Sequence, residues 1–142
     1  MKYECSIEIA CPRAAVVALF KDTSRMGEWQ DGLISFEHLS GEPATKGAKS
    51  RIRYKMGRRE IVMIETLESC DLPESLIAIY EADKVWNRNE NWFVDLGDTT
   101  RWDMKCEFQC NGFVKILSVL MPGMFRKQTM KMMGNFKAFV EG

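Results

Sequence analysis

The chain has 142 residues, a length that fits one domain with a single hydrophobic core and leaves little for a second. Hydrophobic residues make up 46% of it and charged residues 28%, proportions that are typical of globular proteins and exclude a disordered chain. Lysine plus arginine and aspartate plus glutamate each number 20, so no net charge attracts nucleic acid or an anionic membrane.

The N-terminal part of the chain predicts one strand followed by two short helices. Residues 3–9 alternate between apolar and polar side chains, which is the period of a half-buried strand. Pro12 precedes an apolar run and is typical of the first helical position. Asp22 and Ser24 are each suited to capping a second helical turn, which we expect to end near Trp29.

The middle of the chain predicts six strands joined by turns. The strands are expected at residues 33–39, 50–56, 60–67, 76–82, 85–96 and 100–110. Two-residue hairpin loops are expected at 57–58, 83–84 and 97–98. These loops make neighbouring strands antiparallel.

The last part of the chain changes to helical spacing, with apolar residues recurring from 117 to 140. Pro122 interrupts this pattern. We therefore expect either a short segment followed by a longer helix with Pro122 in its first turn, or one kinked helix. The apolar run 113–125 is too short to span a bilayer and contains Lys115, so no membrane insertion is predicted.

This order of strand, two short helices, six strands and long helix resembles the helix-grip domain of the SRPBCC superfamily. That superfamily includes START-like lipid carriers, pollen-allergen-type proteins and polyketide cyclase-like proteins. The local features that carry the resemblance are Pro12, Trp29, the loop segments Ser40–Pro43 and Lys46–Ala48, and the segment Asp98–Trp102. The resemblance covers essentially the whole chain, read as a single domain of residues 1–142. It implies an α+β fold in which a curved antiparallel sheet of about seven strands surrounds a long C-terminal helix and a small-molecule cavity. It implies no catalytic residues, because the members share a cavity rather than a catalytic motif.

Strand pairing indicates which side chains face that interior. Trp102 and Met104 belong to the apolar set of the last strand, which must face the helix. A two-residue loop in the last hairpin then turns Asn87, Asn89 and Asn91 inward, because paired residues share a face. On the outer face the same register sets two opposite charges together, Arg88 opposite Glu107 and Glu90 opposite Lys105.

The other two hairpins add Tyr54, Met63 and Tyr80 to the inner face. Glu65 follows Met63 in phase and is the only acid that we place inside. It is interpreted either as a solvated residue at a strand end or as an acid in the cavity.

The candidate ligand-binding residues are those expected to line the interior. They are Asn87, Asn89, Asn91, Tyr54, Tyr80, Met63, Trp102, Met104, Trp29, Met121 and Phe125. The amides either bond each other, the tyrosines and buried water, or orient a polar group on an otherwise apolar ligand. Each uncompensated buried amide costs about 1–3 kcal/mol, so three on one strand favour a wet or ligand-filled cavity over a sealed core.

No metal or cofactor is predicted. The five cysteines are Cys5, Cys11, Cys70, Cys106 and Cys110, scattered and without a CxxC pair. A zinc site needs clustered ligands, and His38 is the only histidine and has no assigned role. We interpret the cysteines as free thiols in a reducing cytosol, which makes the predicted location cytoplasmic.

The outer face carries a second apolar set. Its members are Val62, Ile64, Ile77, Ile79, Trp86 and Trp92. Because a large apolar patch is usually covered by a partner, we predict a homodimer through the outer face, with Ile77, Ile79, Trp86 and Trp92 in contact.

Three functions remain open. The first is binding or transport of a small amphipathic or hydrophobic ligand. The second is a polyketide cyclase or dehydratase type of enzyme that uses Glu65 or a tyrosine as acid/base. The third is a protein-interaction module that acts through the outer face of the sheet.

Overall fold

The computed structural model describes all 142 residues. Its strands are β1 (Lys2–Ile9), β2 (Leu33–Ser40), β3 (Lys49–Met56), β4 (Arg59–Asp71), β5 (Ser75–Ala82), β6 (Val85–Asp95) and β7 (Thr100–Cys110). Its helices are α1 (Arg13–Phe20), the 3₁₀ helix η1 (Thr23–Glu28), α2 (Gly112–Leu120) and α3 (Gly123–Glu141). The seven predicted strands are therefore all present.

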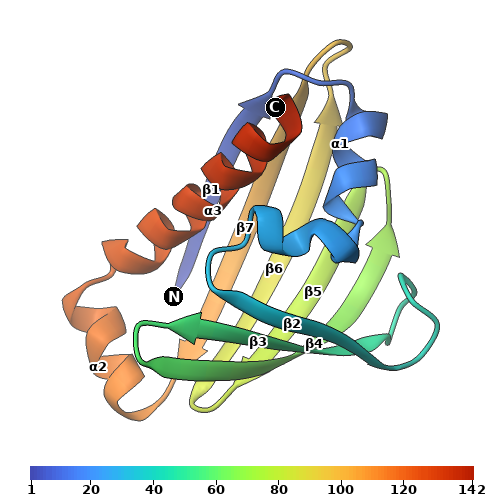
Figure 1. Cartoon of the computed structure of the whole chain (residues 1–142). Helices are drawn as coiled ribbons and strands as arrows, with labels where there is room; N and C mark the ends of the chain where they lie inside the picture. Colours follow the sequence, from blue (N-terminus) through green and yellow to red (C-terminus); the bar gives the residue numbers. More distant parts are fainter.

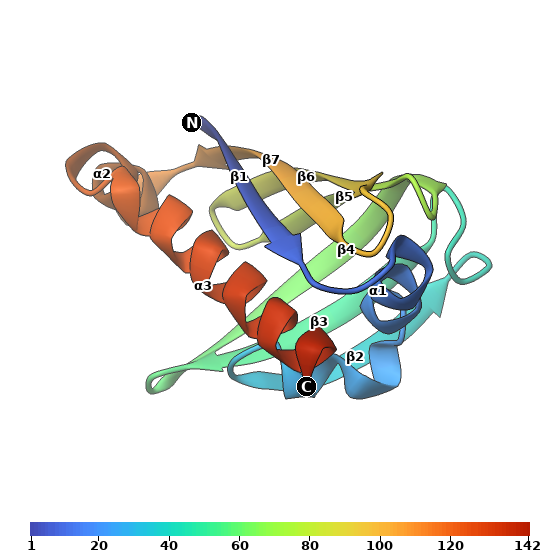
Figure 2. The ribbon, with the colours of Figure 1, turned by 90° about the horizontal axis from the view of Figure 1, so that it is seen from above.

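The strands form one antiparallel sheet in the order β1-β7-β6-β5-β4-β3-β2. The sheet curls, and α3 runs along β1 on its open side, while α1 and η1 lie at the opposite side of the opening (Figures 1 and 2). This arrangement confirms the α+β helix-grip fold that the element order predicted.

The strand register agrees with the predicted hairpins. Asn91 pairs with Met104 between β6 and β7, and Tyr80 pairs with Asn87 between β5 and β6. The hairpin of β3 and β4 also has the expected pairing. The predicted division into inner and outer faces is thereby confirmed for these strands.

Strand β4 runs to Asp71, although the pattern predicted an end at Leu67. The register shifts between Leu67 and Ser69, which leaves Glu68 as an extra residue in a β-bulge. A bulge breaks the two-residue alternation of apolar and polar side chains. The continuation of the strand was missed for this reason.

The predicted helix boundaries are confirmed with small shifts. The Asp22 carboxylate accepts a hydrogen bond from the Ser24 amide at 3.1 Å and caps η1, which ends just before Trp29. Pro12 is the N-cap of α1 rather than its first helical residue, because its ψ of 150° is extended. Pro122 likewise precedes α3 as its N-cap and separates it from α2, so two separate helices form instead of one kinked helix.

Aromatic side chains pack together where α3 crosses the sheet near α1 and η1. Phe136 of α3 is 0% exposed and meets three rings edge to face. Its ring centroid lies 4.8 Å from that of Trp29, 5.2 Å from that of Trp102 and 5.8 Å from that of Phe20. This cluster anchors α3 and closes one end of the interior.

The outer face carries an ion-pair network among its apolar residues. Arg88 stands opposite Glu107 in the register as predicted, but its ion pairs are with Glu68 at 2.6 Å and Glu90 at 2.8 Å. The bulge in β4 brings Glu68 within reach of this face. Trp92 is 38% exposed beside Glu90. The homodimer through this face stays a prediction.

Candidate ligand site

The inner face of the curled sheet brings together most of the predicted site residues. Those on strands are Tyr54, Met63, Tyr80, Asn87, Asn89, Asn91, Trp102 and Met104, joined by Glu65. Phe125 of α3 packs on the ring of Phe108 with centroids 4.8 Å apart. Met121 does not join them, because it follows α2 at a point where the chain leaves the helix and is 53% exposed.

Burial along this inner face differs between its two ends. Near the aromatic cluster, Trp102 is 0% exposed and Asn91 is 2% exposed. Toward the turns that join β3 to β4 and β5 to β6, the side chains of Tyr54, Tyr80 and Asn89 are only partly buried, although Asn87 at the same end is 8% exposed. The interior is therefore a packed core at one end and an accessible concave surface at the other.

The three asparagines of β6 differ in their hydrogen bonds. Asn91 donates to the Leu76 carbonyl at 3.2 Å and accepts from the Trp102 indole at 3.0 Å, so both ends of its amide are used. Asn87 donates to the side chain of Asn89 at 2.9 Å and to the Glu107 carbonyl at 3.0 Å.

Asn89 is the amide with a free donor. Its Oδ1 accepts from Asn87, while its Nδ2 makes no hydrogen bond within the protein. Trp29 Nε1 is the one fully buried side-chain nitrogen or oxygen without a partner, so the unpaired Asn89 Nδ2 keeps contact with solvent. Asn91 therefore fits the interpretation that the amides bond groups within the protein, whereas Asn89 fits the interpretation that they are available to a ligand.

Glu65 lies inside the curl, opposite Tyr80 of β5 and Ser50 of β3. Burial raises the pKa of the Glu65 carboxyl, and a hydrogen bond with the Tyr80 phenol only partly offsets this effect. Burial likewise raises the pKa of Tyr54 and of Tyr80, and the Glu65 charge adds to both shifts. The group combines a carboxyl that resists ionisation with two neutral phenols, so it offers both donors and acceptors.

We predict that Glu65→Gln makes the free energy of unfolding less sensitive to pH. The folded-state pKa of Glu65 is above its unfolded value, near 4.3, so the folded protein holds the proton more tightly. This residue therefore costs stability as pH rises from the unfolded pKa to the folded pKa. The free energy of unfolding of the wild type minus that of the variant should fall by about 1.4 kcal/mol for each pH unit between these two pKa values. Urea unfolding of both proteins from about pH 4, close to the ordinary glutamate pKa, to about pH 8 measures this difference. A difference that does not change with pH would refute the shift.

Trp29 and its neighbour add polar atoms at the η1 side of the interior. The Trp29 side chain is 4% exposed, and its Nε1 is buried without a partner. Gln30 follows it and accepts a hydrogen bond from the Tyr54 phenol. A polar atom of a ligand or water in contact with Trp29 Nε1 would satisfy this donor.

Sequence reasoning missed Tyr3 and Gln30. The Tyr3 phenol donates to the Phe125 carbonyl at 3.2 Å and shares a hydrogen bond with Thr129 at 2.7 Å, which ties β1 to α3. The alternation of β1 already placed Tyr3 on the inner face and was the signal to include it. Gln30 lies in a loop without periodicity, so no comparable signal existed.

Other sequence candidates lie apart from this site. His38 is exposed on β2, where its Nε2 is 2.6 Å from the Gly41 carbonyl oxygen. All five cysteines are free, and burial raises the pKa of the Cys106 thiol to about 12. No three His, Cys, Asp or Glu side chains are placed to hold a metal ion. None of the helices has the length and apolar character needed to cross a bilayer.

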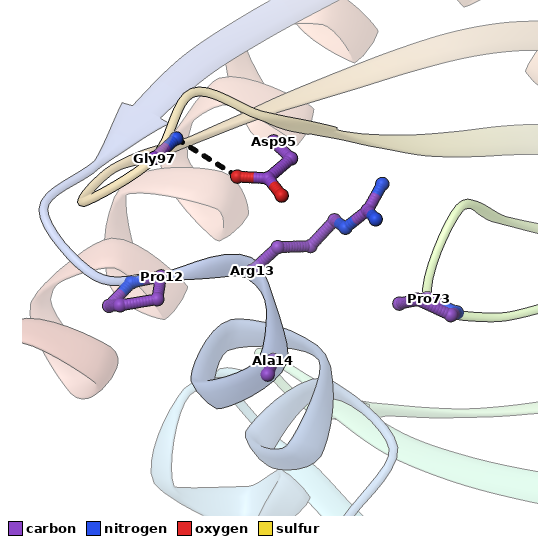
Figure 3. A pocket seen from close by; sticks show the side chains of 6 residues that line it. All are labelled: Pro12, Arg13, Ala14, Pro73, Asp95 and Gly97. Atoms are coloured by element: carbon purple, nitrogen blue, oxygen red, sulfur yellow. Dashed lines mark hydrogen bonds between the residues drawn. The ribbon is translucent and has the colours of Figure 1, made fainter.

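Two surface hollows lie outside the inner face. One of about 250 Å³ lies at the start of α1, lined by Pro12, Arg13, Ala14, Pro73, Asp95 and Gly97 (Figure 3). In it the Arg13 guanidinium donates to the Phe93 carbonyl at 3.4 Å, and Asp95 accepts from the Gly97 amide at 2.9 Å. The other, of about 360 Å³, lies between the end of β7 and α2. Neither hollow is lined by a predicted ligand residue, although Phe108, the ring partner of Phe125, lines the second.

The chain is similar to a known protein family and to several solved structures. A family model described as polyketide cyclase/dehydrase and lipid transport matches residues 1–141. No curated protein matches the chain. The structure of TTHA0849 from Thermus thermophilus has a TM-score of 0.81 at 17% identity, with 99% of this chain and 97% of that chain covered.

Two further structures are similar over nearly the whole chain. The Zhui aromatase/cyclase from a Streptomyces species has a TM-score of 0.81 at 10% identity, covering 99% of this chain and 93% of its own. A START superfamily protein from Mycobacterium smegmatis has a TM-score of 0.80 at 13% identity, covering 99% and 97%. At these identities the likeness shows the fold.

Proposed function

Because this chain belongs to the polyketide cyclase/dehydrase and lipid transport family, we propose that it binds a small amphipathic molecule against the accessible part of its inner face. The observation that carries the proposal is the free amide donor of Asn89 on a concave surface that solvent reaches. Ligand sites are concave and mostly apolar, with a few convergent polar groups. The inner face combines these two properties.

The polar group of the ligand would lie against Asn89, Glu65 and Tyr80. The Asn89 Nδ2 donates to an oxygen acceptor, and the Glu65 carboxyl with its raised pKa both donates and accepts while protonated. A hydroxyl or carbonyl group fits these atoms better than an ionised carboxylate, because no lysine or arginine occupies the inner positions that pair with or lie next to them. Arg59, at the start of β4, is the one basic residue in phase with the inner face of β3 to β7.

The apolar part of the ligand would contact Met63, Met104 and Phe125. Methionine side chains are unbranched and polarizable, so they adapt to ligands of different shapes. Phe125 with its ring partner Phe108 adds an aromatic surface from α3 and β7.

Native mass spectrometry of the protein purified from cells tests the proposal, because a bound ligand adds a discrete mass. We predict that Asn89→Leu reduces the ligand-bound fraction, with affinity lowered about tenfold by the loss of one hydrogen bond to the ligand. The matched control is Gln109→Leu, which removes an exposed amide from the outer face of β7. No copurified mass in wild type, or equal loss in both variants, would contradict the proposal.

The cyclase or dehydratase activity remains the second candidate, and the raised pKa of Glu65 favours it. A carboxyl whose pKa is raised by burial holds its proton more tightly and is better suited to act as a general acid than an exposed one. Should a substrate be found, Glu65→Gln would abolish its turnover while leaving its binding in place. Unchanged turnover would remove Glu65 as the catalyst.

A further inference from the structure

The five most exposed large apolar side chains of the protein lie on α2 and directly after it. They are Phe113 (65% exposed), Ile116 (54%), Val119 (70%), Leu120 (72%) and Met121 (53%), and with Met124 (39%) they form what we call the α2 patch. No residue of α2 is buried. An apolar surface of this kind marks a contact with a partner or a membrane.

Helix α2 stands at one extremity of the molecule. Figures 1 and 2 both show it there, and the turn between β3 and β4 points toward the same end. Met56, at the end of β3 beside that turn, is also 50% exposed, but Figure 2 shows the turn apart from α2. The hollow of about 360 Å³ behind α2 is lined by Phe108, Lys115 and Val119, among others. Val119 therefore lies at the rim of this hollow and also belongs to the α2 patch.

Every charged residue between Glu107 and Glu141 is basic. These residues are Lys115, Arg126, Lys127, Lys131 and Lys137. Lys131 and Lys137 form ion pairs with acidic side chains, whereas the three nearest the α2 patch form none. The zero net charge of the chain hides this local excess of positive charge.

The neighbouring turns change this balance little. Arg58 in the β3–β4 turn and Arg59 at the start of β4 form no ion pairs. The β5–β6 turn contributes Asp83 together with Lys84, whose carbonyl accepts a hydrogen bond from the Asn111 amide just before α2. The end of the molecule that carries the α2 patch is therefore both apolar and positively charged.

We infer that the α2 patch docks the protein on the surface of an anionic lipid bilayer. The apolar side chains enter the boundary between headgroups and acyl chains, while Lys115, Arg126 and Lys127 meet lipid phosphates. Helix α2 has 9 residues, so it lies in the plane of the surface and does not cross the membrane. A second copy of the chain fits less well, because a symmetric contact would bring the same unpaired cations together.

Co-sedimentation with vesicles tests this inference. The protein should bind vesicles of phosphatidylcholine mixed with phosphatidylglycerol, bind phosphatidylcholine alone at least about tenfold more weakly, and dissociate as salt is raised. The double variant Phe113→Ser/Leu120→Ser should weaken binding about tenfold or more. The double variant Arg126→Glu/Lys127→Glu should weaken it by about fivefold or more for each residue.

Two variants at the far end of β2 serve as controls. Leu39→Ser removes a side chain that is 39% exposed, and Lys46→Glu reverses an exposed charge in the next loop. Both should bind vesicles as wild type does. Equal binding to both lipid mixtures, or binding unaffected by the α2 substitutions, would overturn the inference. The inference would also be overturned if the wild type failed to bind vesicles and instead formed a dimer that the α2 substitutions dissociate. The test does not depend on the proposed ligand, because the α2 patch lies outside the inner face.

Discussion

Replacing Phe136 with alanine is expected to lower the free energy of unfolding by about 3–5 kcal/mol. The side chain is 0% exposed and meets the rings of Phe20, Trp29 and Trp102 edge to face. Its removal loses the burial of a whole ring, and the neighbouring rings cannot close the cavity without breaking their own contacts. Since single domains are stable by only about 5–15 kcal/mol, this loss is a large fraction of the total.

Urea unfolding followed by tryptophan fluorescence measures this loss. Phe136→Leu keeps most of the volume and should cost distinctly less than alanine. Phe113→Ala is the matched control, since that ring is 65% exposed and its loss should change stability by no more than about 0.5 kcal/mol. A loss below about 1 kcal/mol for Phe136→Ala would show that α3 is anchored elsewhere.

Replacing Asn91 with leucine is expected to cost about 1–3 kcal/mol of stability, although leucine is more apolar. The amide is 2% exposed and bonds both the Leu76 carbonyl and the Trp102 indole. Leucine leaves the Trp102 Nε1 donor buried without a partner, and such a donor loses its full hydration energy.

Asn89→Leu is the comparison that makes this result informative. Asn89 is two residues along the same face of β6, but its Nδ2 keeps contact with solvent and bonds nothing in the protein. Its replacement should change stability by less than about 1 kcal/mol while weakening ligand binding. The opposite outcome, with Asn89→Leu the more destabilising, would remove Asn89 as the ligand donor.

These two amides illustrate how far strand pairing predicts a site. The alternation of β7 and a two-residue loop were sufficient to turn Asn87, Asn89 and Asn91 inward, because side chains on paired strands share a face. The pairing could not tell which amide holds the core together and which is free. That distinction depends on the indole of Trp102 and on the depth of the sheet's curl.

For Glu65, too, strand pairing predicted the position, and only the structure decided the surroundings. Its inward position followed from the phase of β4, and the register confirms that it faces Tyr80. The two alternatives for this residue, solvated or enclosed, depend on how much of the protein surrounds it. The structure encloses it enough to raise its pKa. The bulge at Glu68 had no comparable sequence signal, because an extra residue simply interrupts the alternation.

By itself, the sequence determined the order of the elements, the strand register and the inner and outer faces. These properties depend on local periodicity and on short loops, which act between residues close along the chain. Only the tertiary structure decided which inner positions solvent reaches, which amide remains free, and that the apolar residues of α2 lie on the surface instead of in the core. The apolar pattern that begins at residue 117 predicts a helix with an apolar side, but periodicity does not reveal what covers that side. That depends on where the end of β7 directs the chain relative to the rest of the fold.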